Sequence, residues 1–315
     1  MSAIFLTVLP VFGLIAIGYG AARTQFIGRE AAQGLSQFVF NMALPALLFR
    51  TMVIMEPQGA GLLALWLAYF GALAVVWIAA AFLSRFTPAL KGDGGASAGM
   101  AAVFGNLVML GLPLTLSHFG EAGAFPVSFI ISVHAPILWL VAVVHLEAAR
   151  QGQVPSVLLL GRVLGLELVK NPIVLALVVG SLWRFSGFGL NPIIDRTLDL
   201  LAGAGVPTAL VALGLSLAGY SLRGQWSGIA LLIALKMVIL PCVVWIAAAK
   251  VMHLPDLWTH VAVLLAAMPT GANAYLFAQR YTTTTPAVSG AIAFGTVVAA
   301  MTSAALLYLM DKGFI

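Results

Sequence analysis

The chain has 315 residues, of which 62% are hydrophobic and only 8% are charged. A soluble domain carries about 25% charged residues, and a soluble chain of this length could not hide so much apolar surface from water. The composition therefore indicates a polytopic integral membrane protein and excludes a soluble domain. We assign the net charge of +5 to loops that face a cytoplasm and anionic lipid, so the expected partner is a bilayer and not a nucleic acid.

A helix that crosses a bilayer needs about 20 predominantly apolar residues. Ten such stretches follow one another with short loops between them, at 3–22, 36–55, 60–84, 97–117, 122–147, 167–185, 198–219, 226–250, 258–279 and 286–310. The first is long and has no Lys or Arg ahead of it, which is typical of a membrane span and not of a cleaved signal peptide.

The longest hydrophilic break, at 150–166, separates five predicted spans from five others. We therefore predict a first repeat over 1–149, a short cytoplasmic linker over 150–166 and a second repeat over 167–315. Because five is an odd number, the two halves must enter the membrane in opposite orientations. This is the inverted-repeat plan of many secondary transporters.

The distribution of positive charge predicts the orientation of the chain. The loops after odd-numbered spans carry Arg23, Arg29, Arg85, Lys91, Arg150, Arg162, Lys170, Arg223 and Arg280. The even-numbered loops and the ends of the chain carry only Arg50, Arg184, Arg196, Lys250 and Lys312. The bias places the odd-numbered loops in the cytoplasm and both termini outside it.

The fourth and ninth spans each contain helix-breaking residues and one amide. The residues are Asn106, Gly111 and Pro113 in the fourth span and Pro269, Gly271 and Asn273 in the ninth. A helix broken in the middle of a bilayer survives only where it lines protein or a watery cavity, and the N-terminus of a half-helix attracts anions. Corresponding breaks in two halves predict a carboxylate site built from these residues. The alternative is that they only kink or pack the helices.

Three further polar residues lie inside predicted spans. Asn41 lies one helical turn before Pro45, so it either extends the polar pocket or bonds a neighbouring helix. Lys236 lies near the bilayer centre, where it either serves function, by holding the anion or helping to couple transport to a proton, or bonds carbonyls freed by Pro241. His134 either relays a proton or bonds a neighbouring helix.

The sequence contains no motif for a resident metal or cofactor. It has no HExxH motif, no Cys/His cluster and no carboxylate pair, and its single Cys242 excludes both an internal disulfide and a Cys-based cluster. The same absences argue against a membrane enzyme.

Taken together, several stretches make the chain resemble the auxin efflux carrier family, over essentially all ten predicted spans. They are Leu9-Pro10, Gly18-Tyr19-Gly20, Phe38–Leu48, Asn106–Pro113, Lys170-Asn171-Pro172 and Pro269–Tyr281. The resemblance implies an all-helical inverted 5+5 fold of a bacterial inner membrane, with scaffold and transport parts. It also implies crossing breaks beside the substrate, and a homodimer formed through scaffold helices. The plant carriers differ in having a long central loop and a second proline at the position of Ala274.

We therefore predict a secondary active transporter that moves a small organic carboxylate by alternating access. The resemblance implies malonate or malate in bacterial members and indole-3-acetate in plants. Two alternatives stay open, a sodium-coupled organic anion symporter of the bile-acid type and a passive anion channel. Coupling to protons or sodium, and the direction of transport, also stay open.

Overall fold

The computed structural model describes residues 2–54, 61–93, 95–151, 161, 165, 168–220, 226–281 and 284–315. This described part is all-helical and contains no β-strand beyond one isolated bridge. The α-helices are α1 (Ser2–Arg23), α2 (Arg29–Phe38), α3 (Leu44–Ile54), α4 (Leu62–Ser84), α5 (Ala96–Val103), α6 (Leu112–Phe119), α7 (Ala124–Gln151), α9 (Pro172–Phe185), α10 (Pro192–Leu217), α11 (Trp226–Ala234), α12 (Leu240–Trp245), α13 (Asp256–Ala266), α14 (Ala272–Tyr281) and α15 (Thr285–Asp311). Shorter helical turns join them: η1 (Val39–Ala43), η2 (Pro88–Leu90), η3 (Leu107–Gly111), η4 (Gly120–Gly123), η5 (Leu235–Ile239) and η6 (Ile246–Val251).

Seven helical stretches among the described residues are long and apolar enough to cross a membrane, whereas the sequence predicts ten spans. The difference comes from the predicted fourth, sixth and ninth spans. The fourth and ninth are each divided by a non-helical segment, and the sixth is represented by the 14-residue helix α9. Much of the predicted linker at 150–166 lies outside the described residues.

Three wide, π-type turns each end two residues before a proline. The turns η1, η3 and η5 end at Ala43, Gly111 and Ile239, and the prolines are Pro45, Pro113 and Pro241. A proline ring clashes with the carbonyl one turn earlier and donates no backbone hydrogen bond. A wider turn moves that carbonyl aside, so the helical path continues through the proline.

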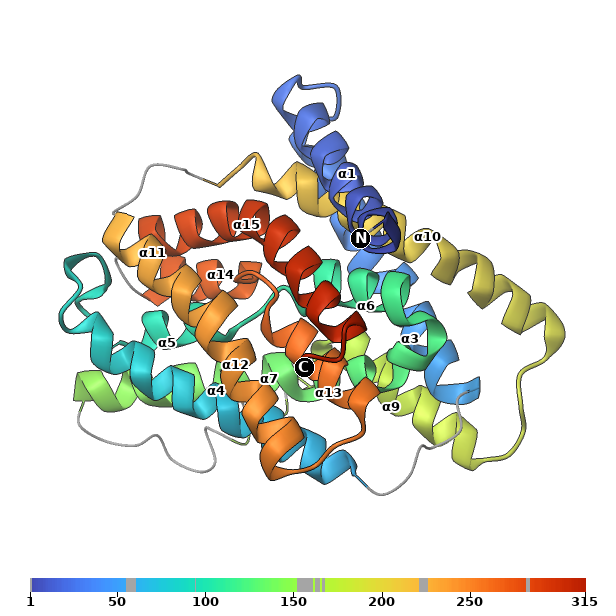
Figure 1. Cartoon of the computed structure of the whole chain (residues 1–315). Coiled ribbons are helices and arrows are strands. Elements are labelled where there is room, and N and C mark those ends of the chain that lie inside the picture. The colour runs from blue at the N-terminus through green and yellow to red at the C-terminus, as the bar shows by residue number, and fades with distance from the viewer. Residues whose placement is uncertain are drawn as a thin grey trace.

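The helices form two groups (Figure 1). The side group consists of α1, α2, α3, α9 and α10, in which α1 packs along α10 and α3 packs along α9. The main group consists of α4 to α7 and α11 to α15. Contacts of α15 with α1, of η3 with α10 and of α7 with α9 join the two groups. Each group thus combines helices from before and after the central break at 150–166.

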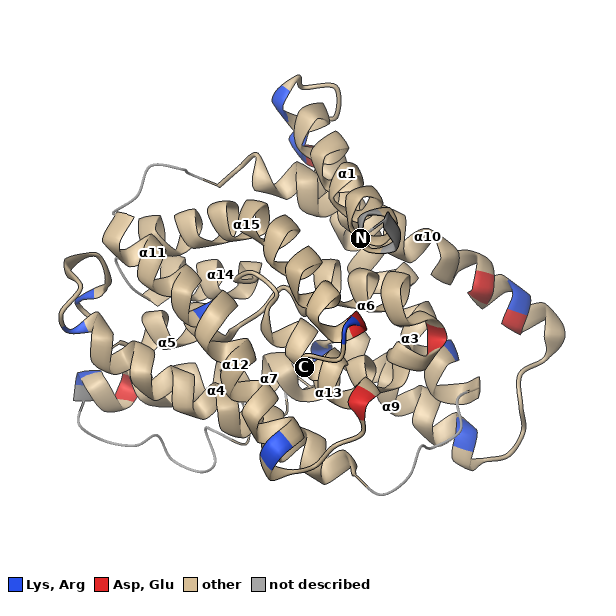
Figure 2. Ribbon diagram, in the orientation of Figure 1, with Lys and Arg blue, Asp and Glu red and all other residues tan. Residues whose placement is uncertain are grey.

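Charged residues lie mainly at helix ends and in loops, while the body of the molecule is almost free of them (Figure 2). Large apolar residues are exposed along its helices, including Ile17 (64% exposed), Leu63 (68%) and Val297 (67%). Water would not tolerate so continuous an apolar surface, but lipid does. The protein is therefore an integral membrane protein.

Glycines allow α1 and α10 to approach very closely. A methyl group at position 214 would lie 2.0 Å from the carbonyl oxygen of Ile15 and 2.8 Å from the amide nitrogen of Tyr19. A methyl group at position 18 would lie 2.2 Å from the carbonyl oxygen of Val211. These neighbours are backbone atoms and cannot rotate away, so small residues determine the distance between the helices.

We expect Gly214→Ala to force α1 away from α10 and to destabilise the protein by about 1–3 kcal/mol, as overpacking does elsewhere. The measurement is the thermal unfolding midpoint of the detergent-purified protein. Gly203→Ala on the same helix is the control, because nothing lies within 4 Å of a methyl group at that position. Equal midpoints for the two variants would contradict the prediction.

Candidate functional site

Two non-helical segments cross in the interior of the main group. One joins α5 to η3 through Phe104, Gly105 and Asn106, and the other joins α13 to α14 through 267–271. They pair antiparallel: the amide of Asn106 donates to the Pro269 carbonyl (2.8 Å), and the amide of Gly271 donates to the Phe104 carbonyl (2.8 Å). Each break thus satisfies backbone groups that the other exposes, which a membrane interior requires.

Glycine at two positions makes this crossing possible. A methyl group at position 271 would lie 3.0 Å from the carbonyl oxygen of Gly105 and 3.0 Å from Cδ1 of Phe104. One at position 105 would lie 2.9 Å from Cδ2 of Leu107 and 3.2 Å from Nζ of Lys236. Gly271 is predicted from sequence to belong to the site, and the structure adds Gly105.

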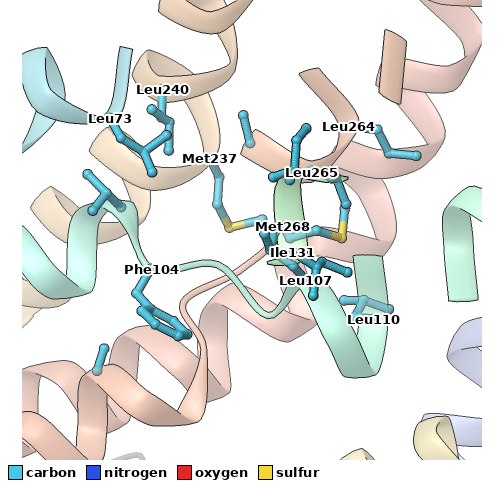
Figure 3. Packing of buried hydrophobic residues seen from close by; sticks show 14 of the residues in the cluster. Leu73, Phe104, Leu107, Leu110, Ile131, Met237, Leu240, Leu264, Leu265 and Met268 are labelled. Carbon is cyan, nitrogen blue, oxygen red and sulfur yellow. The ribbon is translucent and has the colours of Figure 1, made fainter. Parts of the chain in front are cut away.

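Apolar side chains enclose the crossing. Figure 3 shows the two segments passing each other among buried residues, which include Leu107, Leu110, Ile131, Met237, Leu265 and Met268. Gly111 lies in this packing, since a methyl group there would lie 2.7 Å from Cδ2 of Leu265. This apolar packing fixes the geometry of the paired segments.

The side chain of Lys236, a residue of η5, reaches the C-terminal end of α13. This side chain is fully buried, and its Nζ donates a hydrogen bond to the carbonyl of Ala266, the last residue of that helix. A cation is favoured at this position because helix C-termini carry partial negative charge. The acceptor therefore belongs to another helix and not to the carbonyls that Pro241 frees in the lysine's own helix.

A cavity of about 150 Å³ lies next to the crossing, between the two helix groups. Its lining includes four of the residues selected from sequence, namely Asn106, His134, Gly271 and Asn273. The side group contributes three polar residues that the sequence analysis did not select, namely Asn171, Ser216 and Tyr220.

Helices begin around this cavity at three places. Asn106 precedes η3, which continues into α6, and Gly271 precedes α14. Asn171 precedes α9, and its side-chain oxygen accepts hydrogen bonds from the amides of Ile173 (3.0 Å) and Val174 (3.4 Å). The sequence signal for this third helix start is the Asn-Pro pair at 171–172, a capping residue followed by proline at the first helical position. The three helix starts contribute partial positive charge to the cavity.

Several polar groups in the cavity wall are uncommitted. Among the described residues, the side-chain amides of Asn106 and Asn273 have no protein hydrogen-bond partner. Both ring nitrogens of His134 also lack one there, although the residue is only 3% exposed. No group of three or more His, Cys, Asp or Glu in the described chain could hold a metal ion. The wall therefore offers amides, hydroxyls and one imidazole to a ligand.

The other residues selected from sequence lie outside the cavity lining. Asn41 is exposed in η1, and Pro113 is buried in the first turn of α6. Pro269 contributes its carbonyl to the crossing. The structure thus brings the two asparagines of the broken helices together with His134, but it does not bring Asn41 to them.

Comparison with known proteins establishes the family. The family model described as "Membrane transport protein" matches residues 3–307. The chain belongs to this family, which includes auxin efflux carriers. The transporter is 31% identical to a Rhizobium meliloti protein named "Putative malonate transporter", over 97% of this chain and 95% of the relative. It is 23% identical to the auxin efflux carrier component 8 of Arabidopsis thaliana, over 96% of each chain. An uncharacterized transporter of Methanothermobacter thermautotrophicus is 27% identical over 93% of each chain.

Proposed function

We propose that the protein is a secondary active transporter that carries a small organic carboxylate across the membrane by alternating access. The observation that carries this proposal is the cavity between the two helix groups, where three helix starts and two uncommitted asparagine amides meet. Because the relatives are named as transporters, the comparisons point to a role other than catalysis.

The chemistry of the wall favours an anion. Amide N–H groups donate hydrogen bonds, and helix N-termini attract negative charge. A hydrogen bond to a charged group contributes about 1.5–3 kcal/mol, so two asparagines and the helix ends suffice to hold a carboxylate. No Asp or Glu is among the described residues that line the cavity, so none of these repels the anion.

The size of the cavity favours a small acid. Pockets for drug-sized ligands measure about 300–1,000 Å³, whereas this cavity measures about 150 Å³. The smaller volume favours a three- or four-carbon acid such as malonate or malate over a larger ring compound. The name of the Rhizobium relative agrees with this choice.

Alternating access would come from movement of the main group against the side group. The packing supports an inverted repeat of ten spans, with halves at 1–149 and 167–315. In this scheme α1 and α3 belong to the first two spans of one half, and α9 and α10 to those of the other. If the two halves are exchanged, α1 takes the place of α9 and α10 takes the place of α3. The contact of α1 with α10 is therefore equivalent to the contact of α9 with α3, and both contacts are present.

We place the transporter in a bacterial inner membrane with both termini outside the cytoplasm, because positive residues concentrate in the odd-numbered loops. A monoanion leaving a cell that is negative inside gains about 2.3 kcal/mol per 100 mV, so efflux needs no coupling ion. Uptake of a dianion requires protons or sodium. Assembly as a homodimer through the side group belongs to the same proposal.

Counterflow in proteoliposomes tests the function. We expect vesicles loaded with unlabelled malonate to accumulate labelled malonate transiently and saturably, without sodium. Flux that does not saturate and shows no counterflow would indicate a channel, and strict sodium dependence would indicate a symporter of the bile-acid type. Failure of malonate, malate, succinate, lactate and indole-3-acetate alike would contradict the carboxylate assignment.

A further inference from the structure

His134 is buried against the cavity without a hydrogen-bond partner. The imidazole lines the same cavity as Asn106 and Asn273, and neither of its ring nitrogens is bonded within the described part of the chain. Leaving both nitrogens of a buried imidazole unpaired is unfavourable, and most buried polar groups in proteins are paired. The two nitrogens are covered although the ring lines the cavity, so a shift of the ring or of a neighbouring side chain would bring them to a ligand there.

Aromatic rings hold this imidazole in place. Its ring centroid lies 4.9 Å from that of Phe104, 6.1 Å from that of Tyr69 and 6.3 Å from that of Phe70. Phe104 belongs to the crossing segment, and Tyr69 and Phe70 belong to α4. These rings pack around the imidazole, which lines the same cavity as the two asparagine amides.

The charged and titratable groups around His134 provide no negative partner. Tyr69 lies beside it on α4, and Tyr220 lines the same cavity. The ammonium of Lys236, on η5, is near enough to repel an imidazolium. Helices α3, α5, α6, α9 and α13 and the turn η4, which carries Glu121, also pack on α7, but they contribute no charged residue to the described lining. The counter-ion of a positively charged imidazole must therefore come from the ligand.

We propose that His134 takes up one proton when the anion binds and pairs with it as an imidazolium. The proton moves from solvent to a ring nitrogen, and the anion in the cavity supplies the charge that stabilises it. Binding of the anion and binding of the proton then strengthen each other by the same factor. With the asparagines and helix starts holding one carboxylate, the imidazolium takes a second, so a dicarboxylate is bound together with one proton.

This inference rests on the carrier function proposed above, and calorimetry separates the two. Malonate binding to the intact protein is measured in two buffers of different ionisation enthalpy, above about pH 7 where a free imidazole is mostly neutral. We expect an uptake of about one proton per malonate, and an affinity that falls about tenfold for each pH unit of increase. His134→Gln and His134→Asn are expected to bind malonate more weakly, with no proton uptake and no pH dependence.

His145→Gln is the matched control on the same helix. This histidine lies outside the cavity lining and already accepts a hydrogen bond from Trp77 (2.9 Å), so the variant should take up a proton as the unmodified protein does. Malonate binding without proton uptake, or uptake that persists in both His134 variants, would overturn the role of His134 and leave the carrier function intact. If the unmodified protein binds none of the carboxylates tested, both proposals fail.

Discussion

Replacing Asn106 with alanine is expected to weaken malonate binding about ten- to a hundredfold. The side-chain amide lies in the cavity wall and has no protein partner among the described residues, so its hydrogen bonds are available to the anion. Loss of a hydrogen bond to a charged group corresponds to about 1.5–3 kcal/mol, which gives this range. The measurement is calorimetric binding to the purified protein.

Stability should change little in this variant. The crossing uses the backbone amide of Asn106, which alanine keeps, and the φ of −77° and ψ of 63° at this position do not require asparagine. We expect Asn273→Ala to behave similarly, since its amide lies in the same wall. A thermal unfolding midpoint close to that of the unmodified protein would show that the loss is in binding.

Asn41→Ala is the matched control for both asparagines. The sequence assigns Asn41 to the same pocket, but the structure leaves its side chain exposed and outside the cavity. We expect it to bind malonate normally. Loss of binding in Asn41→Ala with normal binding in Asn106→Ala would place the anion site elsewhere.

Replacing Lys236 with methionine is expected to destabilise the crossing and to weaken anion binding with it. Methionine fills nearly the same space but leaves the Ala266 carbonyl without its donor, at a cost of about 1–3 kcal/mol. The ammonium also lies beside Gly105, which lines the cavity, so its removal takes positive charge away from the site. The measurements are the thermal unfolding midpoint and the malonate affinity of the same preparation.

Lys250→Met in η6 provides the comparison, since this lysine is exposed and its ammonium lies 5.0 Å from the centroid of the Trp245 ring. An exposed contact of this kind contributes about 0.5–1 kcal/mol, so we expect the smaller change. If Lys236→Met unfolds at the normal temperature, burying the ammonium costs as much as its hydrogen bond returns, and the crossing does not depend on it. If it keeps its stability and loses all transport, Lys236 serves function and not structure.

The amino-acid sequence by itself determined the class of the protein and which two spans are broken. Composition indicated a membrane protein because apolar surface on this scale requires lipid. Glycine and proline indicated these breaks because they act on the backbone of their own and adjacent turns. The second break does contain Pro269 and Gly271, whereas the first lies at 104–106 and the helix continues through Gly111 and Pro113. Such effects depend on neighbours in the chain, so they can be predicted without knowing the packing.

Only the tertiary structure decided which polar groups meet at the cavity. Asn171, Ser216 and Tyr220 reach it from the side group, and Lys236 finds its acceptor at Ala266, 30 residues along the chain. Asn41 lies near a proline in the sequence, as Asn106 and Asn273 do, but its side chain is exposed. These outcomes depend on how each helix is rotated and against which helix it packs. Many distant contacts set that rotation together, and no local pattern of residues records it.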